Sequence, residues 1–264
     1  MKPLVVIPNF SRKPEDVEVL ADTIRSVEKT VPGETDILVI DDHSPDDDVR
    51  ILVRDLTEEL DFDLIEKKAN SGFSTTVNFG LRKARDEGRD AVLMNADIEM
   101  DVPDWVRKCQ ETIDGDENPA AVIGALLIYP QSGLIQHAGI YFSFLTRRFY
   151  EKYKYAPARL PAALRRAELP VTGAFQYIRH KTLTDVGIYD ERFRMGFEDV
   201  DYSIRVFLAG MHCVYNPQVR AYHFESMFRG EKSEQITKWE VDSFNQLNLK
   251  YAGQSFAQFV PTEF

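Results

Sequence analysis

Three acidic residues stand close together in the C-terminal third of the chain, at Glu198, Asp199 and Asp201. The apolar residues that follow recur at helical spacing, so the sequence predicts a helix that begins near Glu198. Acids in a first helical turn are stabilised by the partial positive charge of the helix N-terminus, which is one explanation of the cluster. The other is catalytic, because a carboxylate held at the mouth of a cleft can act as a general base.

More acids follow two short apolar runs in the first half of the chain. Asp41 and Asp42 come directly after one run, and Asp97 comes shortly after the other. Ligands bind beyond the carboxyl ends of the strands in open α/β sheets, so we expect these side chains to share one crevice. They suit a nucleotide sugar: one acid can accept hydrogen bonds from base or ribose, and another can hold a divalent cation on the diphosphate.

The elements that must position these residues alternate in type. Short continuous apolar runs predict buried parallel strands, and the segments between them show helical periodicity. This alternation predicts right-handed βαβ units in a doubly wound sheet. The predicted strands are 4–7, 37–40, 62–65, 91–94, 121–128, 140–142, 171–180, 213–215 and 220–222, and the predicted helices include 48–60, the segment from 198 and 233–251.

Composition narrows the class of protein. The chain has 264 residues, 44% of them hydrophobic, and 43 acids against 32 bases give a net charge of −11. Such an acidic surface does not wrap nucleic acid non-specifically. Cys109 and Cys213 stand alone in apolar surroundings, which favours buried thiols in a reducing compartment. No run approaches the ~18 apolar residues of a membrane span, so we expect a cytoplasmic protein, with peripheral contact to the inner face of a membrane left open.

The segment 146–166 is basic and aromatic, and it contains two prolines. Proline argues against one long regular element. We interpret the segment as a mobile loop over the cleft, and a solvated surface loop explains it nearly as well.

Eight short motifs resemble, in order, those of the inverting glycosyltransferases of family 2, which have the GT-A fold. Among these enzymes the likeness is greatest to the bacterial rhamnosyl- and galactofuranosyltransferase-like branch. The matching pieces are Val6-Ile7-Pro8-Asn9-Phe10, Val39-Ile40-Asp41-Asp42-His43-Ser44, Asn70-Ser71-Gly72-Phe73 with Asn78-Phe79-Gly80, Met94-Asn95-Ala96-Asp97, Ile135-Gln136-His137-Ala138-Gly139, Val171-Thr172-Gly173-Ala174-Phe175, the segment 186–205 and Tyr222-His223. The resemblance implies a Rossmann-like mixed central sheet flanked by helices, followed by a C-terminal helical extension.

The resemblance also implies roles for individual positions. Asp199 matches the catalytic base, with Glu198 as its neighbour. Asp97 matches the metal-binding acid of the Asp-x-Asp motif, whose first position is occupied by Asn95 in this chain. His223 matches a metal ligand of some members. The nucleotide-sugar site would consist of Pro8, Asn9, Asp41, Asp42, Asn70, Gly72, Asn95 and Ala96, and the acceptor site of Gly173, Ala174 and Phe175, although core packing explains Phe175 better. We expect His137 to lie in a turn.

By this resemblance the chain is a hexosyl- or pentosyltransferase. It would use Mn²⁺ or Mg²⁺ and a UDP- or dTDP-sugar donor, with UDP favoured weakly. The acceptor could be a polysaccharide or other glycan, a lipid-linked glycan, a protein or a modified base. We expect a transferase domain over residues 1–225, with a nucleotide-sugar half at about 1–100 and an acceptor half at about 101–225. The tail 226–264 would be a helix packed on the domain or a homo-oligomer contact.

Two other functions remain open from the sequence. A nucleotidyltransferase would usually carry a glycine-rich phosphate loop after the first strand, and residues 5–14 contain no glycine. A degenerate GT-A fold that only binds a glycan or scaffolds a complex would not need to keep Asp97, Asp199 and His223 together.

Overall fold

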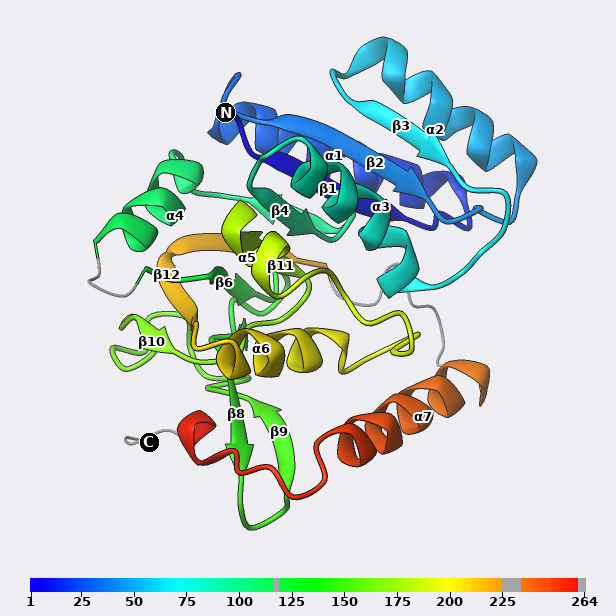
Figure 1. Cartoon of the computed structure of the whole chain (residues 1–264). Coiled ribbons are helices and arrows are strands. Elements are labelled where there is room, and N and C mark those ends of the chain that lie inside the picture. The colour runs from blue at the N-terminus through cyan, green and yellow to red at the C-terminus, as the bar shows by residue number, and fades with distance from the viewer. Residues whose placement is uncertain (116–118, 225–233, 261–264) are drawn as a thin grey trace.

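The computed structural model describes residues 1–115, 119–224 and 234–260. A mixed sheet of ten strands passes through the centre, in the order β10-β12-β6-β11-β4-β1-β2-β3, with β5 and β7 paired outside this path to β12 and β6 (Figure 1). The N-terminal half consists of β1 (Leu4–Asn9), α1 (Pro14–Thr30), β2 (Asp36–Asp41), α2 (Asp47–Glu59), β3 (Asp63–Glu66), α3 (Phe73–Asp86) and β4 (Ala91–Met94).

The remaining elements build the other half of the molecule. They are β5 (Ile98–Met100), α4 (Trp105–Asp114), β6 (Val122–Ile128), β7 (Ile135–His137), β8 (Ile140–Ser143), β9 (Arg148–Glu151), β10 (Ala167–Glu168), β11 (Phe175–Ile178), α5 (His180–Asp185), α6 (Glu198–Leu208), β12 (Cys213–His223), α7 (Glu234–Lys250) and the 3₁₀ turn η1 (Ala257–Phe259). No helix in these described ranges is long and apolar enough to cross a bilayer.

The N-terminal half has the parallel βαβ architecture that the sequence predicts. Strand β1 pairs in parallel with β2 and with β4, and β2 pairs in parallel with β3. Helix α1 begins at Pro14, where a missing N–H costs nothing, and Asp46 caps α2 by accepting from the amide of Asp48. The carboxyl ends of β1, β2 and β4 therefore meet at one edge of the sheet.

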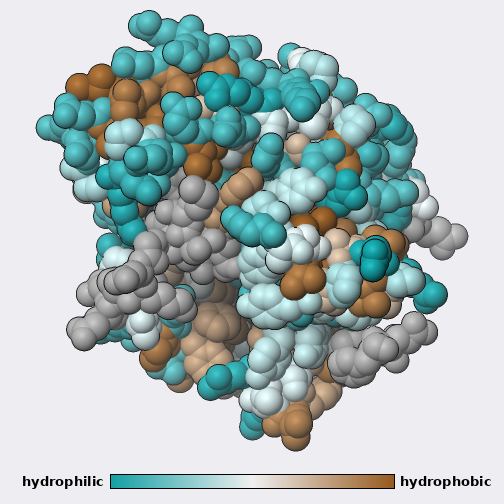
Figure 2. Space-filling view, turned by 180° about the vertical axis from the view of Figure 1, so that it is seen from behind, coloured by the Kyte–Doolittle hydropathy of each residue, from teal (hydrophilic) through white to brown (hydrophobic). Residues whose placement is uncertain are grey.

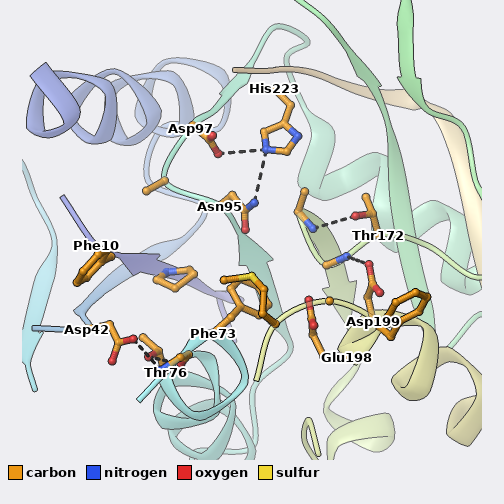
Figure 3. Close-up of a pocket in the computed structure, with 18 of the residues that line it drawn as sticks. Phe10, Asp42, Phe73, Thr76, Asn95, Asp97, Thr172, Glu198, Asp199 and His223 are labelled. Carbon is orange, nitrogen blue, oxygen red and sulfur yellow. Dashed lines mark hydrogen bonds and ion pairs between the residues drawn. The ribbon is translucent and has the colours of Figure 1, made fainter. Parts of the chain in front are cut away.

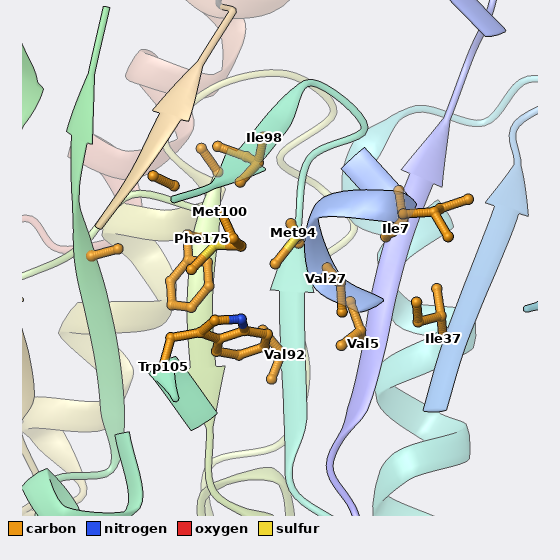
Figure 4. Packing of buried hydrophobic residues seen from close by; sticks show 14 of the residues in the cluster. Val5, Ile7, Val27, Ile37, Val92, Met94, Ile98, Met100, Trp105 and Phe175 are labelled. Atoms are coloured by element: carbon orange, nitrogen blue, oxygen red, sulfur yellow. The ribbon is translucent and has the colours of Figure 1, made fainter. Parts of the chain in front are cut away.

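Buried side chains fill both faces of this sheet. One core lies under α1, α2 and α4, where the Trp105 ring meets the Phe175 ring edge-on at 5.7 Å between centroids (Figure 4). The second core lies under α3, α5 and α6. Cys109 and Cys213 are both buried free thiols, as predicted. The doubly covered sheet explains why the strands are continuous apolar runs.

The structure corrects three predicted elements. Residues 213–223 form one long strand, β12, with a register shift between Asn216 and Arg220, where the sequence predicted two short strands. The predicted strand 171–180 is regular only over β11. Within the predicted loop 146–166, residues 148–151 form β9, which pairs antiparallel with β8 in a hairpin.

The C-terminal helix packs against this hairpin and against α6. A third apolar cluster joins the three elements, and η1 completes it (Figure 1). It contains Ile140 and Phe142 from β8, Phe193, Val200 and Ile204 around α6, and Leu247, Tyr251 and Phe259 from the end of the described chain.

Helix α3 packs unusually close to β1, and this contact yields a stability prediction. A Cβ atom at Gly80 would stand 2.4 Å from Cγ1 of Val6. Gly80→Ala should therefore lower the free energy of unfolding by about 1–3 kcal/mol. In an exposed helix the same change would be stabilising, because alanine has a higher helix propensity than glycine. Urea denaturation followed by circular dichroism measures the change.

The double variant Gly80→Ala/Val6→Ala supplies the control. The smaller side chain at position 6 makes room for the new methyl group, so the double variant should lose less stability than the sum of the two single variants. Strict additivity would contradict the proposed contact.

Candidate active site

A cleft of about 650 Å³ opens at the carboxyl edge of the sheet. Its walls come from the ends of β1 and β4, the segment before α3, the residues before β11 and the start of α6. All but two of the site residues predicted from the sequence line it: Pro8, Asn9, Asp42, Asn70, Gly72, Asn95, Ala96, Asp97, Gly173, Ala174, Glu198, Asp199 and His223. Figure 3 shows the side chains grouped on different walls of the cleft.

The two exceptions are Asp41 and Phe175. Asp41 is buried, and its carboxylate accepts from the Asn9 amide group at 2.8 Å and from the Ser44 backbone N–H at 2.9 Å. It therefore fixes the turn beside the cleft. Phe175 is fully buried against Trp105, so its ring cannot stack on a sugar. The acceptor role suggested for Phe175 is wrong, and core packing is its function.

Asp42 organises one wall of the cleft. Its two oxygens accept from the backbone N–H groups of Ser71 and Gly72, each at 2.9 Å, and the Lys67 ammonium forms an ion pair with it. Lys67 is nearly buried and also donates to Thr76 at 2.8 Å. Lys67 was not among the site residues predicted from the sequence. Asp42 thus holds the segment that presents Asn70 and Gly72 to the cleft.

Asp97 and His223 meet on a second wall. Oδ1 of Asp97 lies 3.1 Å from Nε2 of His223, and both side chains are almost buried (Figure 3). The other ring nitrogen, Nδ1, donates to Oε1 of Gln136 at 2.5 Å. A ring nitrogen that donates to a carbonyl leaves the opposite nitrogen available for a metal.

The donor atoms on this wall fit a hard divalent cation. Oδ1 of Asn95 is buried without a hydrogen-bond partner, and the Asn95 amide nitrogen lies 3.5 Å from Nε2 of His223. Within the described residues no group of three or more His, Cys, Asp or Glu side chains is arranged around a metal position. A carboxylate and an imidazole would leave most coordination positions to water and to substrate phosphate, which is how Mg²⁺ and Mn²⁺ bind in many nucleotide sites.

Asp199 lies on the third wall, in the first turn of α6. The backbone N–H of Gly173 donates to its Oδ2 at 2.9 Å, and that of Val200 donates to Oδ1 at 2.7 Å. Burial raises the pKa of Asp199, the Gly173 hydrogen bond opposes the rise, and the negative charge of Glu151 adds to it. The net direction is upward, which makes the carboxylate a stronger base.

The backbone before Asp199 is tightly constrained. Gly196 and Phe197 both have positive φ, 77° and 66°, so α6 starts from a sharp and locally strained turn. Strain of this kind persists where surrounding contacts hold it, often at functional sites. Glu198 also lines the cleft beside Asp199.

Contacts from two distant segments hold α6 and the loop that precedes it. The Asn78 side chain donates to the Tyr189 carbonyl at 2.9 Å and accepts from its N–H at 3.0 Å. The buried Asp201 carboxylate pairs with Lys250 at 2.6 Å and accepts from the Tyr251 hydroxyl at 2.8 Å. The position of Asp199 thus depends on α3 and on the end of α7.

His137 and Glu151 also line the cleft, and neither was predicted to belong to the site. His137 is buried in β7, so its prediction as a turn residue is wrong. Its Nδ1 donates to Glu151, and its Nε2 accepts from the N–H groups of Gly139 at 3.2 Å and Thr172 at 3.4 Å. Thr172 precedes Gly173, the partner of Asp199. One feature of the sequence could have pointed to Glu151, because it is the sole acid in the basic segment 146–166.

Comparison with known proteins agrees with this architecture. Residues 4–187 match the profile of the family described as Glycosyl transferase family 2. The chain belongs to this family. The match ends before α6, so it covers neither Asp199 nor His223.

Two curated relatives of this family 2 chain are similar in sequence. The uncharacterized protein y4gI of Sinorhizobium fredii is 26% identical over 226 residues, which are 83% of this chain and 24% of that protein. The O-antigen biosynthesis protein RfbC of Myxococcus xanthus is 23% identical over 233 residues, which are 85% of this chain and 17% of that protein. The chain therefore spans about a quarter of their length or less.

Solved structures show the fold. A structure of GalNAc-T7 with UDP, GalNAc and Mn²⁺ is similar with a TM-score of 0.69 and 18% identity, over 91% of this chain and 47% of that one. The mannosyltransferase PcManGT of Pyrobaculum calidifontis, in complex with GDP-Man and Mn²⁺, has a TM-score of 0.63 and 17% identity, over 96% of this chain and 64% of that one. The GT-A fold predicted for this family 2 chain is confirmed.

The contact between Glu151 and His137 leads to a prediction about Asp199. Glu151→Gln keeps an oxygen that accepts from His137 but removes the negative charge that raises the pKa of Asp199. The pKa of Asp199 should fall toward its ordinary value, so Asp199 would ionise at lower pH. An NMR titration of the Asp199 carboxyl carbon measures this.

Glu168→Gln is the matched control, because Glu168 is an exposed acid of β10 that does not line the cleft. It should leave the titration of Asp199 unchanged. An unchanged or higher pKa in Glu151→Gln would show that the two carboxylates do not interact.

Proposed function

We propose that this chain transfers a sugar from a nucleoside diphosphate sugar to an acceptor hydroxyl, with metal assistance and inversion at the anomeric carbon. The observation that carries the proposal is that Asp199 lies on one wall of the cleft while Asp97 and His223 lie on another (Figure 3). A single displacement requires a base on the acceptor side of the anomeric carbon and positive charge on the leaving-group side. The family match to glycosyltransferases supports it.

Asp199 is the proposed general base. Its carboxylate takes the proton of the acceptor hydroxyl while that oxygen forms a bond to the anomeric carbon. The bond from this carbon to the donor diphosphate breaks in the same step, and attack from the opposite face inverts the centre. The amides of Gly173 and Val200 fix the carboxylate in place, and its raised pKa favours acceptance of a proton. Glu198 adds a second carboxylate beside it.

Asp97 and His223 are the proposed metal ligands, and Asn95 lies beside them. Mn²⁺ or Mg²⁺ bound there would neutralise the charge that develops on the leaving diphosphate. Gln136 orients the imidazole by accepting from its Nδ1. Such partners of a ligating histidine support metal affinity.

The donor would lie along the wall that Asp42 organises. Pro8, Asn9, Asn70, Gly72 and Ala96 line this part of the cleft, in the proposed nucleotide-sugar half of the domain, residues 1–100. We propose UDP as the nucleotide, with dTDP as the alternative. One similar structure holds UDP and another holds GDP-Man, so the donor panel below includes all three nucleotides.

The acceptor would enter beside Gly173 and Ala174, in the proposed half 101–225. Lys154, Glu151 and Trp239 also line the cleft, so the site offers both charges and an indole ring to a glycan. The name of the O-antigen biosynthesis relative supports a glycan acceptor. We also propose the rhamnosyl- and galactofuranosyltransferase-like branch, and hence a hexosyl or pentosyl donor.

The first test is transfer or hydrolysis across a panel of nucleotide sugars, with Mn²⁺ or with EDTA. One donor should be consumed, and NMR of the product should show the inverted anomer. Asp199→Asn should lower the transfer rate about 10²–10⁴-fold, because it removes the base but keeps the shape.

Asp185→Asn is the control, because Asp185 is an exposed acid of α5 outside the cleft. It should retain full activity. If the folded wild type neither binds nor turns over any donor, the transferase proposal fails and a binding module replaces it.

A separate experiment tests the cation site. Asp97→Asn and His223→Ala should each raise the Mn²⁺ concentration needed for half-maximal activity, about 10–100-fold, with partial rescue by excess Mn²⁺. Calorimetric titration of Mn²⁺ in the presence of UDP gives the same comparison without turnover. His180→Ala, outside the cleft, is the control. Full activity of the wild type in EDTA would rule out metal assistance.

A further inference from the structure

The turn of the β8–β9 hairpin exposes two large apolar side chains. Phe144 is 59% exposed and Leu145 is 94% exposed. The hairpin extends away from the central sheet, and its turn forms the lowest point of the molecule in Figure 1. Figure 2 shows hydrophobic colour at this same lower end. We call residues 144–148 the hairpin tip.

The tip is held in this position by the packing beneath it. Phe142 contacts the Phe144 ring edge-on at 5.5 Å and the Phe256 ring at 4.9 Å, and it is buried in the third apolar cluster. The N–H of Arg147 donates to the Ser143 carbonyl at 2.7 Å and closes the turn. Leu145 is therefore presented outward by a well-packed base.

Positive charge follows the apolar tip along the chain. Arg147 and Arg148 follow Leu145 after one intervening threonine, and both are exposed. No ion pair in the described parts of the chain joins either of them to an acid, and the Arg148 guanidinium lies over the Phe244 ring at 5.3 Å from its centroid. Residues 144–166 contain seven basic residues and one acid, in a chain of net charge −11. The basic residues are Arg147, Arg148, Lys152, Lys154, Arg159, Arg165 and Arg166. An anionic surface would attract this segment and repel most of the rest.

We propose that the hairpin tip docks on an anionic membrane surface, with Phe144 and Leu145 in the interfacial layer and Arg147 and Arg148 among the lipid head groups. Leucine has neither hydrogen-bonding groups nor an aromatic face, so a polysaccharide or a nucleic acid gains little from contact with Leu145. A lipid layer gains by burying it. Neither an apolar tip nor a few basic residues suffices alone, and stable peripheral binding combines two such signals.

The strand β9 connects this surface to the cleft. It runs from Arg148 at the tip to Glu151, which lines the cleft, and these four extended residues cover about 10 Å. The cleft would therefore stay in water, close to the membrane. The docking does not rest on the proposed function, because lipid binding needs neither donor nor acceptor.

Vesicle co-sedimentation tests the docking with the full chain. The protein should bind vesicles that mix phosphatidylglycerol with phosphatidylcholine, and it should bind vesicles of phosphatidylcholine alone much more weakly. Binding to the mixed vesicles should weaken at high salt. Leu145→Ser should weaken binding about tenfold, and Arg147→Gln severalfold with a shallower salt dependence. Ile51→Ser is the matched control, since Ile51 is 46% exposed on α2 at the opposite end of the molecule (Figure 1).

A fluorescence measurement identifies the occupant. Leu145→Trp adds an indole at the tip, whose emission should shift to the blue on anionic vesicles and be quenched by brominated lipids. Equal binding to neutral vesicles, no binding at all, or binding unchanged by Leu145→Ser would each overturn the proposal. So would an indole that lipids do not quench, because the tip would then contact a protein or a glycan.

Discussion

A backbone hydrogen bond joins the two halves of the cleft, from the N–H of Asn95 at the end of β4 to the carbonyl of Ala174 just before β11, at 3.0 Å. It continues the antiparallel ladder between these strands. Because of it, Gly173, which binds Asp199, lies a fixed distance from Asp97. A slip of one residue would turn Phe175 out of the core and move the carboxylates of the site apart.

The N-terminal half was predictable because its signals are local. A strand that is buried on both faces is a continuous apolar run, and the polar residue that ends it marks the edge where ligands bind. Asn9, Asp42 and Asp97 were found in this way, and all three line the cleft. Asp199 was found because helical periodicity and an acidic first turn are visible within ten residues or so of sequence.

The rest of the site depends on contacts between distant residues. Phe175 faces the core and Ala174 the cleft only because β11 pairs with β4 in one register, which no short window of sequence reveals. Lys67 meets Asp42 across 25 positions, and His137 meets Thr172 across 35. A lysine in a polar stretch and a histidine that follows a glutamine give no local signal of burial. β12 was divided in the prediction because Asn216 and Pro217 interrupt its apolar pattern at the register shift.

The contact between Lys250 and Asp201 has a consequence for the order in which the molecule is made. Asp201 is buried in the helix that carries Asp199, and it is paired with Lys250, the last residue of α7, and with the hydroxyl of Tyr251, the residue after it. During synthesis these two residues leave the ribosome only after all strands of the sheet have left it. The early part of the chain can fold as it is synthesised. Asp201 can pair with Arg205 inside its own helix, but its partners outside the helix come from almost the last residues described. The growing polypeptide would thus acquire the wall that Asp42 organises first and the full set of contacts around the wall that carries Asp199 last.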